Sequence, residues 1–303
     1  MSLPVIIPNS MTEQMTSDSE TDWLSRLPGI VEGCARHWEL RLGEPLEPSH
    51  VWMKVNYIVP AILPGGREVV LKVLSSPRTF RREHEALKHT CRESAVELVN
   101  TSEEWSALLL ERVRPGVPLS EMADDEENTR IAASIMRSYW RPPPEKHGLQ
   151  SVSYRIGGLS RLRERYGGGT GPVPELWVSR AESAFVELAI ESKGDRLLHG
   201  DLHQWNILSS DRIPWLAIDP QGFYGDPGYD LHALLGNLPE KSCAGRDSAR
   251  IRARRADVLA EELCVDREWV LTWAWACSAL YAALYPHEWE NHIARAEEFF
   301  SLT

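Results

Sequence analysis

The chain has 303 residues, of which 43% are hydrophobic and 25% are charged, and its formal net charge is −11 at pH 7. This length allows two lobes of ordinary domain size, and the composition is typical of a globular enzyme. The acidic balance argues against general nucleic-acid binding, and no apolar run reaches the roughly 18 residues that a membrane span needs.

The first 22 residues, MSLPVIIPNSMTEQMTSDSETD, are polar and lack the basic and long apolar regions of a signal peptide. We therefore expect a poorly ordered tail over residues 1–22. The five cysteines are scattered, odd in number and without a CxxC motif, which favours free thiols in a reducing compartment. Together these features predict a cytoplasmic protein that does not associate with membranes, and no protein partner is evident.

The first third of the chain predicts two helices that flank a β-hairpin. Helical spacing, β-branched runs and a Pro-Gly-Gly turn place a helix at 23–38, strands at 50–63 and 68–74, and a charged helix at about 77–89. Lys72 lies on the returning strand, and its neighbours Leu71 and Val73 are expected on the opposite face because side chains alternate along a strand.

The rest of the chain predicts one further strand and then a mainly helical lobe. Leu108–Val113 is expected to be a buried strand. The later expected elements are helices at 125–139, 174–192, 249–263 and 267–285 and a short strand at 215–218. This order predicts an α+β protein with an N-terminal lobe at 23–112 and a C-terminal lobe at 113–303.

The most informative stretch is HGDLHQWNIL (His199–Leu208), which is followed by AIDPQG. Asp201 and Asn206 are five residues apart, and Asp219 lies thirteen residues beyond Asn206. This order is typical of ATP-dependent phosphoryl transfer: one carboxylate accepts the hydroxyl proton, while an amide oxygen and a second carboxylate hold Mg²⁺. The protein-kinase catalytic loop has the same Asp-to-Asn spacing.

A zinc site is the alternative interpretation of this stretch, because His199 and His203 form an HxxxH pair. Zinc would need helical spacing and a third ligand, and Gly200 and Asp201 favour a loop instead. The apolar residues Leu198, Ile207 and Leu208 are expected to anchor the two ends of that loop in a core.

HGDLHQWNIL followed by AIDPQGFYGDPGYDL resembles the aminoglycoside phosphotransferase superfamily, and more closely the streptomycin 6-phosphotransferase group, also called the aminoglycoside/hydroxyurea antibiotic resistance kinases. LLLERVRPGVPL (Leu108–Leu119) resembles the inter-lobe hinge of that group, and SYWRPPP (Ser138–Pro144) resembles its Pro-rich segment. The resemblance implies a bilobal protein-kinase-like fold, with an antiparallel sheet and helices in the N-terminal lobe and a mainly helical C-terminal lobe.

The resemblance also implies site residues and cofactors. The catalytic loop residues are Asp201 as proton acceptor, Asn206, and His199, which is expected to brace the loop rather than to do chemistry. ATP and Mg²⁺ are the implied cofactors, with Asn206 and Asp219 as metal ligands. The adenine-binding backbone is expected at Glu111, Arg112 and Val113.

Lys72 is the expected phosphate-binding lysine, because kinase-like folds pair a strand lysine with a helix glutamate. The resemblance favours Glu83 as its partner, and Glu85 is the competitor; solvated charges on a helix are the ordinary alternative for both. No G-x-G-x-x-G loop occurs in this region. Phosphate contacts are therefore expected from Lys72, Mg²⁺ and non-glycine backbone amides.

The acceptor is left open by the sequence. The expected reaction is phosphorylation of a hydroxyl on a small molecule, a cationic streptomycin-like aminoglycoside, which the net charge of −11 would attract. The alternatives are another hydroxylated metabolite or hydroxyurea, and an inactive nucleotide-binding module. Glu240, Glu288 and Glu290 are candidate substrate-facing acids, although the favoured interpretation is that they are ordinary exposed glutamates.

Overall fold

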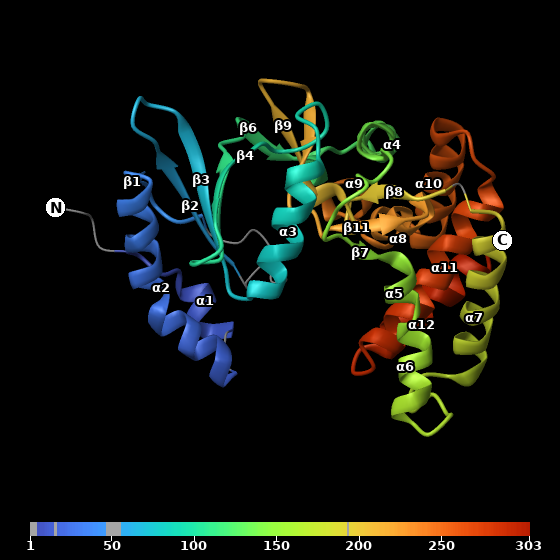
Figure 1. Cartoon of the computed structure of the whole chain (residues 1–303). Coiled ribbons are helices and arrows are strands. Elements are labelled where there is room, and N and C mark those ends of the chain that lie inside the picture. The colour runs from blue at the N-terminus through green and yellow to red at the C-terminus, as the bar shows by residue number, and fades with distance from the viewer. Residues whose placement is uncertain (1–4, 15–16, 47–55, 193) are drawn as a thin grey trace. The chain divides into compact units, whose positions relative to one another are not determined.

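The computed structural model describes residues 5–14, 17–46, 56–192 and 194–303 (Figure 1). The chain forms two compact units: the first comprises Met1–Lys88 and Val96–Val113, and the second comprises His89–Ala95 and Arg114–Thr303. The second unit thus takes in a short segment, His89–Ala95, that lies within the expected N-terminal lobe. Each unit is described by itself below.

A five-stranded antiparallel sheet forms the centre of the first unit, with the order β1-β2-β3-β5-β4. Its strands are β1 (Arg41–Leu42), β2 (Asn56–Ile62), β3 (Glu68–Leu74), β4 (Leu98–Ser102) and β5 (Ala107–Glu111). The predicted hairpin is β2–β3, in which Ile58 lies opposite Lys72. Residues 50–55 of the expected first strand lie outside the described residues.

One face of this sheet is covered by α2 (Asp18–His37). The helix buries Trp23, Leu27, Val31 and Cys34, three or four positions apart, against strand residues such as Leu71. This spacing places the apolar side chains in one stripe of an α-helix. Alternate residues of the strands, the set that contains Val69, Leu71 and Val73, meet that stripe, so the core lies between α2 and the sheet.

The opposite face of the sheet carries Lys72 and is covered by α3 (Pro77–His89). Figure 1 shows α2 and α3 on the two sides of the strands. Leu71 and Val73 have their side chains in the α2 core, as the alternation predicted, and Lys72 points the other way. The buried residues of α3 include a glutamate, Glu83, together with Phe80 and Ala86.

The expected poorly ordered tail over residues 1–22 differs from the structure. The described part of that segment contains α1 (Asn9–Gln14) and the start of α2, and Met11 is buried in the core. Ser17 begins α2 with a capping box: its side chain accepts from the Glu20 backbone, and the Glu20 side chain accepts from the Ser17 backbone. The polar composition that suggested disorder therefore includes a helix start signal.

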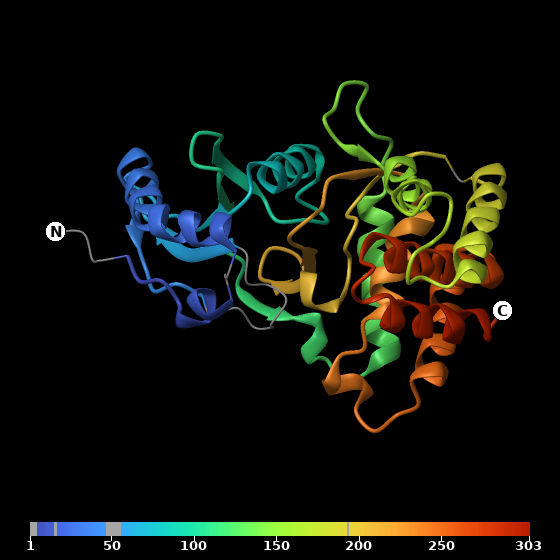
Figure 2. The ribbon, with the colours of Figure 1, turned by 90° about the horizontal axis from the view of Figure 1, so that it is seen from below.

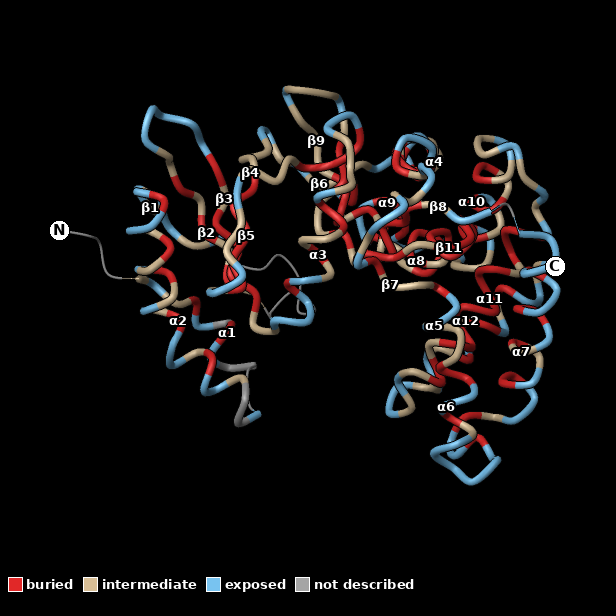
Figure 3. The backbone as a smooth tube through the Cα atoms, viewed as in Figure 1, coloured by how far each residue is buried: buried red, intermediate tan, exposed pale blue. Residues whose placement is uncertain are grey.

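Helices make up most of the second unit, and they pack around α11 (Arg267–Leu284). Its sequence, REWVLTWAWACSALYAAL, is apolar on nearly all sides, which is typical of a helix buried on every face. Figure 3 shows α11 mostly buried, and Figure 2 shows α7 beside the C-terminal helices. Its neighbours include α6 (Gly158–Arg165), α7 (Glu175–Ile190), α8 (Leu231–Gly236), α10 (Ser248–Leu263) and α12 (Trp289–Phe300).

Two small three-stranded sheets complete the second unit, with the orders β10-β9-β6 and β7-β11-β8. Their strands are β6 (Pro115–Pro118), β7 (Gln150–Ser151), β8 (Arg196–Leu198), β9 (Ile207–Ser210), β10 (Trp215–Ala217) and β11 (Phe223–Gly225). The remaining helical segments are α4 (Asp125–Tyr139), α5 (Val152–Ile156), α9 (Glu240–Cys243) and the 3-10 turns η2 (Leu119–Glu121), η3 (Gln204–Asn206) and η4 (Pro227–Asp230).

The two units together have the α+β composition that the sequence predicted: an antiparallel sheet with helices in the first, and mainly helices in the second. Trp269 and Trp273 are buried, as expected for core residues of α11. Among the described residues, no helix has both the length and the apolar character that crossing a bilayer requires.

Candidate active site

The HGDLHQWN loop connects β8 to β9, and its ends are anchored in the core of the second unit. Leu198 and Ile207 at the two ends are fully buried, as is Leu202 in the middle of the loop. Leu208 is half-buried, so it anchors less than expected. With apolar residues buried on either side, the polar residues between them are held in one region.

Asp230 fixes the backbone of this loop. Its Oδ2 accepts a hydrogen bond from the His199 backbone N–H (3.0 Å) and from the Trp140 indole (2.9 Å), and its Oδ1 accepts from the Gly200 backbone N–H (2.6 Å). Burial raises the pKa of Asp230 to about 6, while these hydrogen bonds favour the ionised form. Asp230 lies in the quoted GYDL segment, but no local sequence pattern indicated its role.

Gly200 allows this loop to turn tightly. Its φ of +82° lies in the left-handed region, and a Cβ there would come within 2.3 Å of the Phe223 ring. Any other residue would therefore displace the loop or β11. Gly200 stands where the protein-kinase loop has an arginine, and the structure gives the steric reason for glycine.

His199 is fully buried, and both nitrogens of its ring contact the backbone. Nε2 lies 2.8 Å from the Ile218 carbonyl, and Nδ1 accepts from the Asp201 backbone N–H at 3.3 Å. The ring also packs on Tyr139, at 5.5 Å between centroids. These contacts fit the expectation that His199 supports the loop. The imidazole has no contact with solvent.

Asp201 is half-buried, but 43% of its side chain is accessible to solvent. The His203 Nε2 lies 3.7 Å from its Oδ1. Burial of its surroundings raises the pKa of Asp201; His203 and Arg155 oppose that effect, and the charge of Asp219 adds to it. The carboxylate is thus reachable by a hydroxyl and more basic than an ordinary aspartate.

Asn206 and Asp219 meet at the end of the β9–β10 hairpin. Ala217 lies opposite Ile207 in the antiparallel register, and the ladder extends one step further because the Ile218 N–H donates to the Asn206 carbonyl at 2.9 Å. The Asn206 Nδ2 donates to the Asp201 carbonyl at 3.0 Å, which turns the amide oxygen away from that backbone. Asp219 follows directly, so the hairpin brings the expected ligands together from positions thirteen residues apart.

Asp219 has a φ of +63°, a left-handed conformation that is uncommon for a residue with a side chain. Such strain costs of order 1 kcal/mol or more and persists where the surrounding structure imposes it, often at functional sites. Here the hairpin ladder ends at Ile218 and Pro220 is buried on the other side. The backbone strain therefore indicates a functional role for Asp219 independently of the sequence motif.

The donor set fits Mg²⁺ better than zinc. Among the described residues, no three His, Cys, Asp or Glu side chains are grouped so that they could hold a metal ion. His199 is engaged with the backbone, which removes it from the alternative HxxxH zinc site. Mg²⁺ at a phosphoryl-transfer site needs only one or two protein oxygen ligands beside phosphates and water, and the Asn206 amide and the Asp219 carboxylate are of that kind.

Arg255 supports the loop from below through Gln204, which is fully buried in η3. With its amide oxygen turned toward the guanidinium, Gln204 accepts from Nη1 at 3.0 Å and from Nη2 at 3.2 Å. The same guanidinium binds Asp125 of α4 through Nε and Nη2, and it donates to the carbonyls of Leu234 and Asn237. This network joins the loop to α4, α8 and α10, and no sequence pattern predicted it.

A cluster of one arginine and several tyrosines also interacts with Asp201. Arg155 donates to the hydroxyls of Tyr229 (3.3 Å) and Tyr285 (3.5 Å) and lies 5.4 Å from the ring centroid of Tyr281. Both Arg155 and Tyr281 interact electrostatically with Asp201. These residues come from α5, η4, α11 and the C-cap of α11, and only Tyr229 lies in a quoted motif, where no role was assigned to it. The expected acids Glu240, Glu288 and Glu290 are exposed.

In the first unit, Lys72 and Glu83 form a buried ion pair, with 2.7 Å between Nζ and Oε1. The competing Glu85 lies 3.2 Å from Lys88. The structure therefore places Lys72 and Glu83 together, from the middle of β3 and the middle of α3. Glu111 is the last residue of β5, and Arg112 and Val113 follow it, all half-buried, at the end of the unit.

Comparison with known proteins identifies the family. The sequence model of the aminoglycoside/hydroxyurea antibiotic resistance kinases matches residues 48–288. The chain belongs to this family. It is 30% identical over 275 residues to a streptomycin 6-kinase of Streptomyces griseus, covering 89% of this chain and 87% of that protein. It is 31% identical over 222 residues to a hydroxyurea phosphotransferase of Kitasatospora aureofaciens, covering 71% and 63%.

Solved structures show the same fold. The choline kinase LicA from Streptococcus pneumoniae, also solved in complex with AMP, superposes with a TM-score of 0.61 at 13% identity, covering 90% of this chain and 98% of that one. This likeness confirms the protein-kinase-like fold class that the sequence predicted. As a member of the antibiotic resistance kinase family, the chain is a small-molecule kinase.

Proposed function

We propose that this kinase transfers the γ-phosphoryl group of ATP to a hydroxyl of a streptomycin-like aminoglycoside and thereby confers resistance to it. The observation that carries the catalytic assignment is the convergence in the second unit. Three groups lie at one end of the β9–β10 hairpin: the solvent-accessible Asp201 carboxylate, the Asn206 amide and the strained Asp219. This combination of groups suits phosphoryl transfer.

In this proposal, Asp201 orients the acceptor hydroxyl and accepts its proton. His199 holds the loop from beneath, and Asp230 holds its backbone. Asn206 and Asp219 would bind Mg²⁺, which supplies positive charge to the phosphate oxygens when bound. The Asp219 charge helps to raise the pKa of Asp201, so neutralising Asp219 would shift Asp201 toward its ionised, proton-accepting form.

The first unit is proposed to bind the nucleotide. Lys72, oriented by Glu83, would contact the phosphates, and the backbone of Glu111, Arg112 and Val113 would bind adenine. The buried Lys72–Glu83 pair supports this assignment, because a lysine held by a well-placed carboxylate keeps its charge and its direction. Residues 23–112 would thus act as the nucleotide lobe and residues 113–303 as the catalytic and acceptor lobe.

The acceptor assignment is supported by the streptomycin 6-kinase, which this chain matches over 87% of its length. A neutral acceptor such as hydroxyurea is the second candidate, and one observation favours it. The Arg155 guanidinium acts electrostatically on Asp201, so the second unit carries a positive charge on the acceptor side of the candidate base. A positive charge near the candidate base is less favourable for a polycation than for a neutral acceptor.

An ATP-coupled screen tests the proposed function. Purified protein with saturating ATP and Mg²⁺ is offered streptomycin, other aminoglycosides, hydroxyurea and simple polyols, and ADP release is measured. Acceptor-dependent turnover on streptomycin supports the first candidate, and turnover on hydroxyurea alone supports the second. The Asp219→Asn and Asn206→Ala variants should each raise the Mg²⁺ requirement or lose activity; unchanged Mg²⁺ dependence in both would contradict the metal assignment.

The salt dependence of the acceptor kinetics separates the two candidates further. A polycationic acceptor steered by a protein of net charge −11 should lose kcat/KM as ionic strength rises, because salt screens the attraction. A neutral acceptor should show a flat profile. ATP, which is an anion, provides the control, since its kinetics should not share the trend.

A further inference from the structure

The outer face of α7 exposes more apolar surface than the helix needs for its own packing. Its inner face buries Trp177, Phe185 and Leu188 in the second unit. On the outside, Leu176 is 57% exposed, Val186 63% and Ile190 81%. Single exposed apolar residues are ordinary, but three on one helix require an explanation.

These residues form a regular stripe. Leu176, Ser179, Ser183, Val186 and Ile190 follow one another at intervals of three, four, three and four residues, and all five are exposed. That is the a/d pattern with which one α-helix packs along another. The two serines in the middle of the stripe are small, which allows a second backbone to approach closely.

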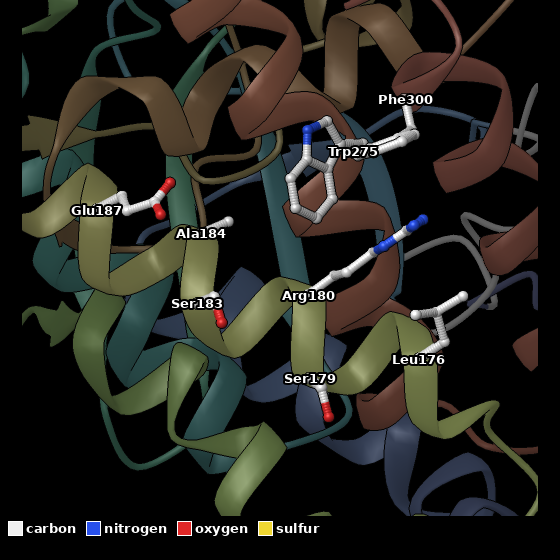
Figure 4. A pocket seen from close by; sticks show the side chains of 8 residues that line it. All are labelled: Leu176, Ser179, Arg180, Ser183, Ala184, Glu187, Trp275 and Phe300. Carbon is white, nitrogen blue, oxygen red and sulfur yellow. The ribbon is translucent and has the colours of Figure 1, made fainter.

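A groove of about 400 Å³ runs beside the stripe (Figure 4). α7 lines it with Ser179, Arg180, Ser183 and Glu187, and Trp275 of α11 and Phe300 of α12 form apolar parts of the wall. The same patch of surface therefore carries both protruding side chains and a hollow. An isologous two-fold contact has this property, because one surface must be complementary to itself.

The charges of the groove are self-complementary as well. The Arg180 guanidinium lies 4.5 Å from the Phe300 ring centroid, and Glu187 lies two helical turns further along the same helix. Within the described part of the chain, neither Arg180 nor Glu187 forms an ion pair. An opposite charge for each of them is available on a second copy of α7.

The centres of the apolar pair and of the charged pair lie half a residue apart, at Ser183 and at the Ser183–Ala184 bond. Leu176 and Ile190 are equally distant in sequence from Ser183, and Arg180 and Glu187 are equally distant from the Ser183–Ala184 bond. A two-fold axis near these centres would place a second, antiparallel α7 so that Leu176 meets Ile190 of the partner subunit. Arg180 would then meet Glu187 of the partner subunit, and each contact would occur twice.

We propose that this face of α7 is a dimer contact, in which two copies of the chain pack their α7 helices antiparallel about Ser183 and Ala184. This inference is independent of the proposed substrate. The contact consists of one helix pair with its flanking groove, which is at the small end of specific interfaces. We therefore expect dissociation constants in the micromolar range.

Sedimentation velocity on the full chain tests the proposal, over a concentration series that spans the micromolar range. The wild-type mass should rise from the 34.3 kDa of the monomer toward twice that value. Arg180→Glu and Glu187→Arg should each weaken dimerisation about tenfold or more, since each places like charges together twice. The double variant R180E/E187R should recover dimerisation, because the swap restores opposite charges.

Ile190→Lys should also abolish the dimer, while Arg250→Glu, a charge reversal at an exposed position of α10, serves as the matched control and should leave it intact. Circular dichroism confirms that each variant is folded. The proposal is overturned if the wild type stays monomeric throughout, if a dimer survives both Arg180→Glu and Ile190→Lys, or if the double variant fails to recover. A stability change in Ile190→Lys that is independent of protein concentration would show a covering segment within the chain, and would overturn it too.

Discussion

Lys72–Glu83 in the first unit and Asp125–Arg255 in the second are both buried ion pairs, yet they differ in the shape of the cation. Lys72 is a compact ammonium group that Glu83 directs from the neighbouring helix. The Arg255 guanidinium binds Asp125 and also donates to two backbone carbonyls and to Gln204. The first pair is built to orient a charge, whereas the second connects the scaffold under the HGDLHQWN loop.

The difference matters because a buried ion pair by itself is weak evidence for stability. Replacing both partners with apolar residues is often neutral, since it removes two desolvation penalties together with the attraction. Buried carbonyls that lose their donor keep a cost of about 1–3 kcal/mol each. Removal of a whole pair should therefore change the free energy of unfolding differently for the two pairs.

The largest effect is expected at the proposed proton acceptor, Asp201. Asp201→Ala should lower turnover by about 10²–10⁴-fold, because it removes the proposed proton acceptor. ATP binding, measured by calorimetry or by nucleotide fluorescence, should be largely unchanged. Near-wild-type turnover in this variant on the true acceptor would show that Asp201 is not the base.

Removing Arg255 should produce the largest loss of stability. Arg255→Met leaves Asp125 charged and unpaired in the core, at a cost of about 3–5 kcal/mol in the free energy of unfolding. Adding Asp125→Leu should recover only part of that loss, because the Leu234 and Asn237 carbonyls and Gln204 remain without their donor. Chemical denaturation provides the measurement.

The matched control for this series is Arg250→Met, on the exposed side of the same helix, which should change stability by less than about 0.5 kcal/mol. Full recovery of stability in R255M/D125L would contradict the view that Arg255 acts as a hub for several groups. It would place the Asp125–Arg255 pair in the same class as Lys72–Glu83.

The first-unit pair should show the opposite pattern. The double variant K72M/E83L should unfold within about 1.5 kcal/mol of the wild type, since apolar side chains of similar volume replace the pair. Its turnover should nevertheless fall about 10²-fold or more, because no positive charge is left to contact the phosphates. If K72M/E83L keeps both its fold and its activity, Lys72 is not the phosphate-binding lysine.

A pH series of unfolding measurements extends the comparison to another buried group of the second unit, His232 in α8. Burial lowers the pKa of His232 from 6.5 to about 4, so the folded protein holds this imidazole neutral. As pH falls, the His232 imidazole therefore binds a proton at a higher pH in the unfolded chain than in the folded protein. The contribution of His232 to stability is therefore complete above pH 6.5 and is lost between pH 6.5 and 4, by up to about 3 kcal/mol.

Asp230 acts in the opposite sense over part of the same range. Its raised pKa of about 6 means that its contribution is present below the unfolded value and is lost as pH rises through 6. The His232→Gln variant separates the two: the stability difference between wild type and variant should shrink on acidification. A difference that stays constant from pH 7 to 4 would show that His232 does not titrate in this way.

Several elements were predictable because their signals are local. The β2–β3 hairpin follows from β-branched runs around a Pro-Gly-Gly turn. Helical periodicity predicts α4, α7, α10 and α11, and all of these except α10 have an acidic residue in the first turn. The start of α2 was missed, although its Ser17–Glu20 capping box is a local signal, because the polar composition around it was taken as a sign of disorder. Short two-residue strands such as β1 and β7 have no local pattern long enough to detect.

The sequence by itself predicted which residues of the HGDLHQWN loop and the β9–β10 hairpin could take part in phosphoryl transfer. Asp201, Asn206 and Asp219 lie within nineteen residues of one another, and the hairpin that joins them is encoded by the apolar runs on either side. The pairing of Lys72 with Glu83 is similarly close, at a separation of eleven residues on a strand and the next helix. Where the groups that act together are near in the chain, local geometry is enough to bring them together.

Only the tertiary structure decided what holds that segment in place. Asp230 reaches the loop from thirty residues away, Arg255 pairs with Asp125 across 130 positions, and Arg155 reaches Tyr229 across 74. Each is an ordinary charged residue in its local sequence, and its partners are defined by the packing of helices around α11. The self-complementary face of α7 likewise emerges only once folding has buried the rest of that helix, because exposure is a property of the packed chain.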